Sequence, residues 1–593
     1  MSDPYLDDSL EGRFQVDFLK KLWPFVRPYR RGFLACLLIL LVSFGLELAG
    51  PWLLRHAIDG PMRATGEPTD ERLGSLLWYG AGFLGVVAAG ALLGYVYGLL
   101  TAWNGQRVIR DVRRHLFDHL LGTGLSFHER NTAGKLTTRV TSDVENLNEL
   151  IATGVLQSIF DLLKIVGVVF VLFFLDVELA LFTVAATPVV VVLSLLFRNN
   201  AQRAYRAVRG RLALQNAYTT ELIGGVRTTR AFGREAATAA RYAERNAATS
   251  DSWRATVLHF SVFFALVDFA LRATTIGLLW FGGKAVLDGT METGQFIQFW
   301  LYYAMLSGPV KELGEKYNVL QAAFASCERV FQLLAEPRFP PPNPAAKPSE
   351  RRGAMRVEFD RVGFTYDGRT PVLDGMTFTA APGQTIAVVG PTGAGKTTLL
   401  SLVARLRDVT SGAVRIDGTD VRDLEIGSLR RRIAFVAQDL FLFTGTVLEN
   451  VRLFDKSIDE AKVWRALETV GAAEFVRALP NGLLAQVEER GGTFSQGERQ
   501  LLAFARALVV DPDLLVLDEA TASIDSASEA RLQKALEKSL QGRTALVVAH
   551  RLSTVRRADL ILVIERGRIA EAGTHEALLA SGGVYAGMLA HVG

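Results

Sequence analysis

The sequence has few cysteines and only a small net charge. Only two cysteines, Cys36 and Cys327, occur in 593 residues, so no disulfide framework is expected and two buried, idle thiols are predicted. The formal net charge of +4 is small for this length and gives no reason to expect a nucleic-acid partner. The opening residues are acidic and polar, without the basic start and apolar core of a cleavable signal peptide. We therefore expect the first apolar stretch to act as the membrane-insertion signal itself.

Long apolar runs are lacking beyond about residue 330, but they are frequent before it. A bilayer core about 30 Å thick needs roughly 20 apolar residues for each spanning helix. Such stretches lie at about 33–54, 76–100, 151–175, 179–197 and 257–282, and a more polar sixth lies at 294–312. Soluble helices seldom stay apolar on all sides for this long. We predict an all-α membrane domain with six transmembrane helices over residues 1–334.

Basic residues are unevenly distributed among the connections between these stretches. Lysine and arginine gather after the second stretch, from Arg107 to Arg139, and again after the fourth, from Arg198 to Arg234. Because positive charge favours the cytoplasmic side, these two segments and both termini are predicted to lie there, with the chain multi-pass in the cell inner (cytoplasmic) membrane. A surface for RNA or DNA would use the same arginines, but topology explains them more simply. Both segments have a helical composition, with turns expected near 127–135 and 216–225.

Proline and polar residues crowd the segment 335–353, which favours an extended linker between two domains. Beyond it, apolar runs of strand length alternate with helical patterns. This alternation is typical of an α/β domain, which we place at 354–593.

A glycine-rich loop stands between one predicted strand, TIAVVG (385–390), and a helical run, LLSLVARL. The loop fits the pattern G-x-x-x-x-G-K-[ST], whose backbone N–H groups and helix N-terminus hold phosphates. Lys396 can reach the β- and γ-phosphates of ATP, and the Thr397 hydroxyl suits a magnesium ion. The predicted ATP contacts in the loop are Gly390, Thr392, Gly393, Ala394, Gly395, Lys396, Thr397 and Thr398.

A second predicted strand, LLVLDE (514–519), ends in two carboxylates. Asp518 is placed for the magnesium shell, and Glu519 is placed to polarise an attacking water. Many strands end in acidic residues for no catalytic reason, but the phosphate loop upstream favours the catalytic interpretation.

Short motifs in a fixed order resemble those of the ABC transporter superfamily: FTYDG, the glycine loop, FVAQDLFLF, FSQGERQ, LLVLDE, ASID and VVAHRLST. The resemblance covers nearly the whole chain, and a membrane domain placed first on the same chain is typical of the half-size exporters. It implies export of a drug, lipid or peptide by alternating access, driven by ATP and Mg²⁺. A soluble ABC-type ATPase would lack the spans, and an ATP-gated channel or receptor would not need continuous turnover.

The resemblance also implies roles for single residues. Tyr366 would stack on adenine, Gln438 would contact magnesium, and His550 would be the switch histidine that steadies water and phosphate. Ser495 and Gly497 would be the signature residues, and Asp525 would belong to the D-loop. The turns near 127–135 and 216–225 would be coupling helices that dock onto ATPase domains.

The signature motif departs from the family pattern. The usual Leu-Ser-Gly-Gly-Gln reads Phe-Ser-Gln-Gly-Glu at 494–498, so Gln496 replaces a glycine that permits close backbone approach. Glu498 places a negative charge where a neutral amide is normal, near the phosphates. We therefore predict a heterodimer, in which a second half-transporter subunit supplies a normal signature to this chain's ATP site. A homodimeric lipid or drug exporter with two active sites is the alternative.

Ionisable residues at membrane depth are candidates for contact with a transported substrate. Asp161 with Lys164, and Asp268 with Arg272, are spaced so that each pair can neutralise itself along one helix. Glu47 has no such partner nearby in sequence, so it is predicted to face a water-filled cavity.

Overall fold

The computed structural model describes residues 17–64, 68–151, 155–350, 353–518, 534, 537–549 and 552–590. The chain forms two compact units. The first, here called the helical unit, comprises Met1–Asp118 and Gly134–Ala335, and the second, the sheet unit, comprises His119–Ala133 and Glu336–Gly593. The short segment His119–Ala133 thus belongs with the sheet unit, although it lies inside the domain predicted at 1–334.

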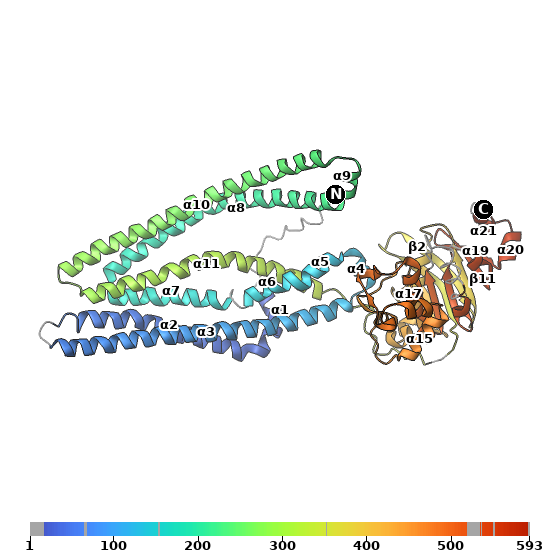
Figure 1. Ribbon diagram of the computed structural model, residues 1–593, viewed down its shortest axis with the longest axis horizontal. Coiled ribbons are helices and arrows are strands. Elements are labelled where there is room, and N and C mark those ends of the chain that lie inside the picture. The colour runs from blue at the N-terminus through green and yellow to red at the C-terminus, as the bar shows by residue number, and fades with distance from the viewer. Residues whose placement is uncertain are drawn as a thin grey trace. The chain divides into compact units, whose positions relative to one another are not determined.

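Long helices and a few short ones make up the helical unit (Figure 1). They are α1 (Asp17–Val26), α2 (Arg30–Asp59), α3 (Thr69–Leu121), α5 (Ala133–Thr138), α6 (Val144–Glu149), α7 (Val155–Leu175), α8 (Val177–Gly224), α9 (Val226–Ala231), α10 (Glu235–Leu287) and α11 (Thr293–Leu334). By length and composition, four stretches of the described chain can cross a membrane: Lys20–Asp59, Thr69–Leu121, Leu156–Leu175 and Glu235–Leu287. The spans predicted at 179–197 and 294–312 fall inside α8 and α11, which are long helices outside those four. The predicted all-α class is confirmed.

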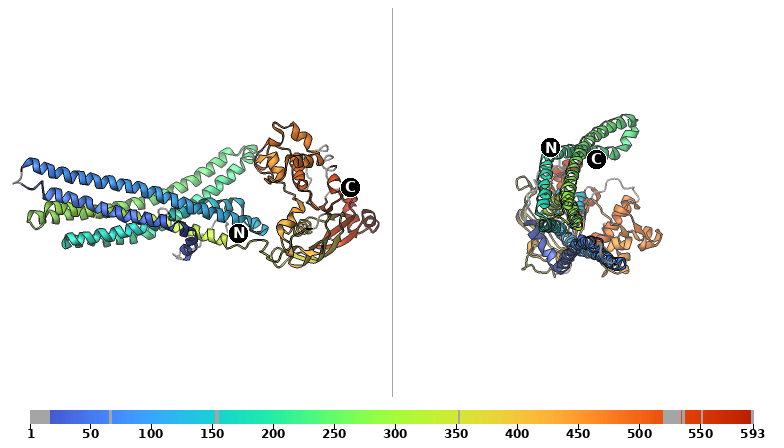
Figure 2. Two further views of the ribbon diagram at one scale, coloured as in Figure 1. Left: turned by 90° about the horizontal axis from the view of Figure 1, so that it is seen from below. Right: turned by 90° about the vertical axis from the view of Figure 1, so that its left-hand side faces the viewer.

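Apolar side chains lie on both the inside and the outside of the helical unit. Helix α11 packs on α2 and α7, and α8 runs beside α10 in both views of Figure 2. Phe299, Leu172 and Leu278 are buried at the contact among these helices. Trp78 and Phe174, by contrast, are 80% and 85% exposed. Large apolar groups facing outward along a helix are expected where lipid is the solvent.

A six-stranded sheet, a four-stranded sheet and a two-stranded sheet, β7-β8, form the sheet unit together with the helices around them. The strands are β1 (Val357–Thr365), β2 (Pro371–Ala380), β3 (Thr385–Val389), β4 (Ser411–Ile416), β5 (Thr419–Asp420), β6 (Ile433–Val436), β7 (Gly445–Thr446), β8 (Gln486–Val487), β9 (Leu514–Asp518), β10 (Thr544–Val548), β11 (Leu560–Glu565) and β12 (Arg568–Gly573). The helices are α4 (Leu125–Arg130), α12 (Lys396–Val403), α13 (Ile426–Arg431), α14 (Val447–Arg452), α15 (Glu460–Thr469), α16 (Ala473–Ala478), α17 (Gln496–Leu508), α19 (Leu552–Arg556), α20 (His575–Ala580) and α21 (Val584–Ala590).

The larger sheet has six strands in the order β12-β11-β3-β10-β9-β6, and only β12 runs antiparallel to its neighbour. The smaller sheet, β2-β1-β4-β5, is antiparallel. Every residue of β9 and β10 is buried, as expected for parallel strands covered on both faces. Helix α12 packs against β9 and β10. The predicted α/β class is therefore confirmed, and so is the expectation of two buried thiols, because Cys36 and Cys327 are both buried and unbridged.

Candidate functional site

The glycine-rich loop connects β3, which ends at Val389, with α12, which begins at Lys396. Its backbone takes conformations that side chains rarely allow. Gly390 has a φ of 155°, and a Cβ placed there would lie 2.2 Å from the carbonyl oxygen of Ile564. Gly395 has a φ of 100°, and a Cβ there would lie 2.7 Å from a methyl group of Leu373. Glycine is required at both positions, which gives a physical reason for this loop sequence.

Lys396, the first residue of α12, turns its side chain back into this loop. Its ammonium group donates hydrogen bonds to the carbonyl oxygens of Gly390 and Pro391 at 2.8 Å and 2.9 Å. The side chain is buried, and burial lowers the pKa of the ammonium group, while the carboxylate of Asp518 acts in the opposite direction. The loop therefore holds one cation among backbone groups, an arrangement suited to phosphate oxygens.

Asp518 lies at the same edge of the large sheet as the loop. Strand β10 lies between β3 and β9, and its Val548 is opposite both Val388 and Asp518. Because parallel strands end at one edge, the last residue of β9 and the loop after β3 meet there. Asp518 is 6% exposed. The predicted catalytic or contact residues Glu519, Asp525 and His550 lie outside the described residues.

Tyr366, the predicted adenine contact, lies beside the helix that follows the loop. Its hydroxyl is 2.9 Å from that of Thr398, either of which can donate the proton, and the residue is 56% exposed. The ring of Phe364 lies at 90° to it, with centroids 4.9 Å apart. The guanidinium of Arg407 covers the ring at 4.7 Å from its centroid. The sequence reasoning did not find Arg407, because it follows α12 without a motif of its own.

Gln438 is exposed in the loop that follows β6. Two side chains hold the later part of this loop. Asn450 accepts from the backbone N–H of Phe443 at 2.8 Å and donates to its carbonyl at 2.7 Å, and Arg506 donates to the carbonyl of Phe441 at 2.8 Å. Burial lowers the pKa of Arg506, since a buried cation is poorly solvated. Sequence analysis missed both anchors, which lie on α14 and α17.

The signature segment begins helix α17. Ser495 is the N-cap, and its hydroxyl accepts from the backbone N–H of Glu498 at 3.3 Å. The Glu498 carboxylate accepts in turn from the backbone N–H of Ser495 at 2.8 Å. Gly497 is buried in the first turn. Within the described residues, no hydrogen bond joins Ser495 to the phosphate loop of the same chain. The structure thus brings together Tyr366, Thr398, Lys396 and Asp518, but not the signature.

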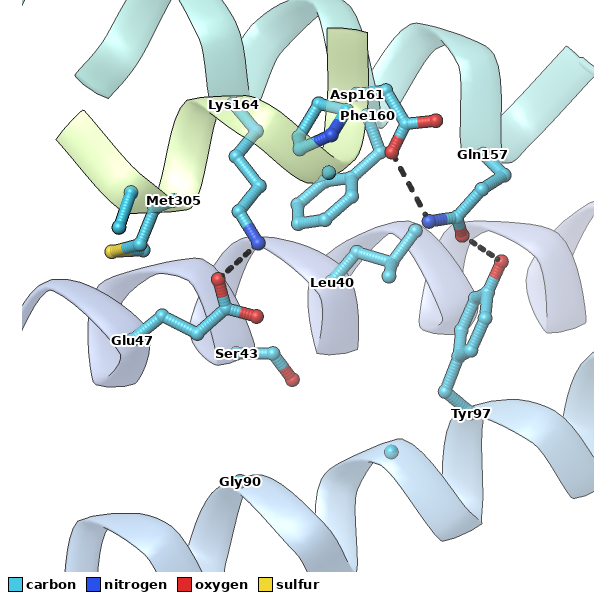
Figure 3. Close-up of a pocket in the computed structure, with 14 residues that line it drawn as sticks. Leu40, Ser43, Glu47, Gly90, Tyr97, Gln157, Phe160, Asp161, Lys164 and Met305 are labelled. Carbon is cyan, nitrogen blue, oxygen red and sulfur yellow. Dashed lines mark hydrogen bonds and ion pairs between the residues drawn. The ribbon is translucent and has the colours of Figure 1, made fainter. Parts of the chain in front are cut away.

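A cavity of about 490 Å³ lies inside the helical unit, between α2, α3, α7 and α11 (Figure 3). Polar and apolar groups share its wall, which is formed by Leu40, Ser43, Glu47, Gly90, Gly94, Tyr97, Gln157, Phe160, Asp161, Lys164, Ala304, Met305, Gly308 and Pro309. The predicted cavity-facing position of Glu47 is therefore confirmed.

The ion pairs in this cavity differ from those predicted. Lys164 pairs with Glu47 on α2, and Asp161 pairs with Lys316 on α11. Gln157 links Asp161 to the hydroxyl of Tyr97, as Figure 3 shows. The expectation that Asp161 would neutralise Lys164 was wrong, because both contacts cross between helices, and Glu47 finds on α7 the partner that its own sequence neighbourhood lacks. The Asp268–Arg272 pair is confirmed at 2.6 Å along α10.

Comparison with known proteins gives matches over almost the whole chain. Residues 33–310 match the ABC transporter transmembrane region, and residues 373–522 match the ABC transporter family. The ABC transporter ATP-binding protein YknV of Bacillus subtilis (strain 168) is 36% identical over 98% of this chain and 96% of its own length.

Other matches bear names that state an activity. An ATP-dependent lipid A-core flippase of Syntrophus aciditrophicus is 32% identical, over 97% of this chain and 94% of its own length. The putative multidrug export ATP-binding/permease protein YgaD of Bacillus subtilis is also 32% identical, over 95% and 97%. Among solved structures, a bacterial Atm1-family ABC exporter with ATP bound aligns with a TM-score of 0.80 and 26% identity, covering 95% of this chain and 98% of that one.

Proposed function

Since the chain belongs to the ABC transporter family and is an ATP-hydrolysing membrane exporter of the multidrug and lipid type, we propose that it moves an amphipathic drug, lipid or peptide out of the cytoplasm by alternating access. The two arginine-rich segments support a cytoplasmic position for the sheet unit and for both termini, with the chain spanning the inner membrane. ATP binding would bring two ATPase domains together, and hydrolysis would separate them.

The observation that carries this proposal is the shared sheet edge, where the phosphate loop and Asp518 meet. Lys396 would stabilise charge on the transferring phosphate, and Tyr366 would hold the base. Glu519 would polarise the water for in-line attack on the γ-phosphate, and His550 would steady water and phosphate. Ser495 and Gly497 of the signature and Asp525 of the D-loop would complete the ATP contacts, and Gln438 would contact magnesium.

Magnesium fits the donor set at this edge. Asp518 offers a buried carboxylate, Thr397 an exposed hydroxyl and Gln438 an exposed amide oxygen, and Mg²⁺ prefers such oxygen ligands. The ion would neutralise charge on the β- and γ-phosphates when bound. The residues that we propose to hold it are Thr397, Gln438 and Asp518.

Replacing the proposed general base tests this assignment. Glu519→Gln should still bind ATP but lose roughly 100-fold or more in ATPase rate, since general base catalysis is removed. Lys396→Ala should weaken ATP binding itself. Glu565→Gln is a control for the loss of a carboxylate, because Glu565 is an exposed glutamate at the end of β11. A normal turnover rate for Glu519→Gln in purified transporter would contradict the assignment. ATP-dependent uphill transport into sealed vesicles separates an exporter from an ATP-gated channel.

The cavity in the helical unit supports an amphipathic substrate over a purely apolar one. Glu47, Lys164 and Tyr97 offer charge and hydrogen bonds, while Phe160 and Met305 offer apolar surface. Glu47→Gln should shift the substrate concentration that half-maximally stimulates ATPase, with the KM for ATP unchanged. Asp268→Asn is the control, since that exposed carboxylate pairs along α10 outside the cavity. Equal shifts of this substrate concentration in both variants would contradict the assignment of the cavity to substrate binding.

The altered signature supports a heterodimer with one competent and one degenerate ATP site. The negatively charged carboxylate of Glu498 caps the N-terminus of α17 by accepting a hydrogen bond from the backbone N–H of Ser495. Ile223 at the end of α8, Val226 at the start of α9 and Phe232 just after α9 are exposed, and we assign this apolar tip to contact with the second subunit's ATPase domain. Co-purification with a half-transporter from a neighbouring gene is the expected result. Full ATPase activity of this chain alone, with two equivalent sites, would favour the homodimer.

A further inference from the structure

Arg407 connects the predicted adenine contact with a segment far away in sequence. Its guanidinium lies over the Tyr366 ring and also forms an ion pair with Glu129 of α4. Tyr366 is in turn hydrogen-bonded to Thr398 of α12, at 2.9 Å. All four residues belong to the sheet unit. A continuous series of contacts thus runs from Glu129 through Arg407 and Tyr366 to the helix that follows the phosphate loop.

The position of Arg407 depends on the partner that neutralises it. Arg407 is 9% exposed, and Glu129 is its one ion-pair partner within the described residues. The neighbouring buried arginine, Arg405, is held differently, by Asp408 and by the carbonyl of Val421. A buried cation that loses its partner is strongly disfavoured. Without Glu129, Arg407 would therefore turn toward water and leave the Tyr366 ring.

Glu129 is presented by a fixed segment. Before α4, the carbonyl of Gly122 accepts from the backbone N–H of Phe339 at 2.8 Å. His119 donates through Nε2 to the carbonyl of Glu336 at 2.9 Å. These bonds join the segment to the chain that enters the sheet unit, so the carboxylate of Glu129 is held near Arg407 by backbone contacts.

We propose that Arg407 is a positioning residue for the adenine base, and that Glu129 sets its position. The guanidinium covers part of the Tyr366 ring and fixes its orientation, and the exposed remainder of the ring stacks on the base. This inference rests on the proposed role of Tyr366. It predicts that the affinity for ATP, and not the rate of the chemical step, depends on the Glu129–Arg407 pair.

Steady-state ATPase measurements on the full-length transporter test the proposal. Arg407→Ala should raise the KM for ATP by roughly 3- to 10-fold, the range expected from a partly buried cation–π contact, with kcat nearly unchanged. Arg407→Lys should give an intermediate increase, because lysine keeps the charge but not the planar group. Arg415→Ala is the matched control, since Arg415 forms an ion pair with Asp360 elsewhere in the sheet unit. A fall in kcat at constant KM would overturn the proposal.

Inorganic tripolyphosphate separates recognition of the base from recognition of the phosphates. As a competitive inhibitor, it should bind Arg407→Ala as tightly as the unaltered protein, because it has no base. An equal weakening of ATP and tripolyphosphate binding would mean that the loop is damaged and would overturn the proposal. If Arg407→Ala does not fold, Glu129→Gln carries the test, with an expected two- to threefold rise in the KM for ATP and no change for tripolyphosphate. An unchanged KM in Glu129→Gln would then overturn it.

Tyr366→Ala distinguishes this inference from the function on which it rests. If Tyr366→Ala leaves the KM for ATP unchanged, the proposed adenine contact is wrong. If it raises the KM while Arg407→Ala does not, only the positioning role fails. The double variant should match Tyr366→Ala alone, because Arg407 acts through the ring.

Discussion

Two helices of the sheet unit begin at residues predicted to contact ATP, and their N-termini are built differently. Helix α12 follows Gly395, a left-handed residue with no side chain to cap the helix. Helix α17 follows Ser495 and has a complete capping box, in which Ser495 and Glu498 bond to each other's backbone N–H groups. The first N-terminus offers its N–H groups to an outside anion, and the second carries an anion of its own.

In the proposed heterodimer, this difference would give the chain a strong half of one ATP site and a weak half of the other. A phosphate at α12 gains from the backbone N–H groups and from Lys396. A phosphate approaching α17 would meet the carboxylate of Glu498 beside Ser495. The capping box stabilises the helix, but it does so with the charge that an anionic ligand would avoid.

Adding a methyl group at Gly395, which precedes α12, should cause the largest loss of ATPase activity. In Gly395→Ala, the new Cβ would lie 2.7 Å from Leu373 and 2.9 Å from the carbonyl of Val372, at a φ of 100°. We expect roughly a 10²-fold loss of ATPase activity, as a shift of about 1 Å in a catalytic contact causes, together with about 1–2 kcal/mol of lost stability. Gly393→Ala is the control: its φ is also positive, but a Cβ there meets nothing within 4 Å. Equal losses in both variants would show that backbone strain alone matters.

Removing the negative charge at the N-terminus of α17 should have a smaller effect, and it should raise the ATPase activity and not lower it. Glu498→Gln keeps the reciprocal capping bond, since glutamine serves there too, but removes the negative charge. ATPase activity of the assembled transporter should rise by roughly two- to fivefold, in line with about 1 kcal/mol of relieved repulsion in wet surroundings. Glu449→Gln is the matched control, because Glu449 forms the same kind of capping box with Thr446 on α14. A rise in both variants, or in neither, would argue against an electrostatic penalty at the signature.

The smallest expected effect is a loss of ATP affinity at alkaline pH. Because burial lowers the pKa of Lys396 below the ordinary value of 10.5, its charge is lost at a lower pH than that of a free lysine. ATP affinity should therefore be constant near neutral pH and fall as pH rises toward 10.5, since ATP binds the charged form. Equilibrium titration with a fluorescent ATP analogue from pH 7 to 10 would measure this. Lys396→Arg, which stays charged, should show no such fall, and a fall in both proteins would assign it to another group.

The elements around the phosphate loop follow local rules, and the sequence predicted them well. The expected strand at 385–390 is β3, and the expected helical run LLSLVARL begins inside α12. Asp518 ends its predicted strand. Glycine spacing and apolar runs are properties of neighbouring residues, which is why a single sequence carries them.

Contacts between distant segments were not predictable in the same way. Helical spacing predicted a pair between Asp161 and Lys164, but each residue has its ion-pair partner on another helix. Arg407 belongs to no motif, and its contacts with Tyr366 and Glu129 join positions with no shared pattern. The roles of Glu519, Asp525 and His550 stay predictions, since these residues lie outside the described residues.

The crossed ion pairs of the cavity have a consequence for how the bundle can open. Glu47–Lys164 fastens α7 to α2, and Asp161–Lys316 fastens it to α11. Parting α7 from either neighbour would separate two opposite charges inside the helical unit, which costs free energy unless another polar group replaces the lost partner. Helix α7 is therefore held to two neighbours by charge, and opening the bundle there would be easier where water, or a charged group of a bound molecule, takes the place of the departing partner.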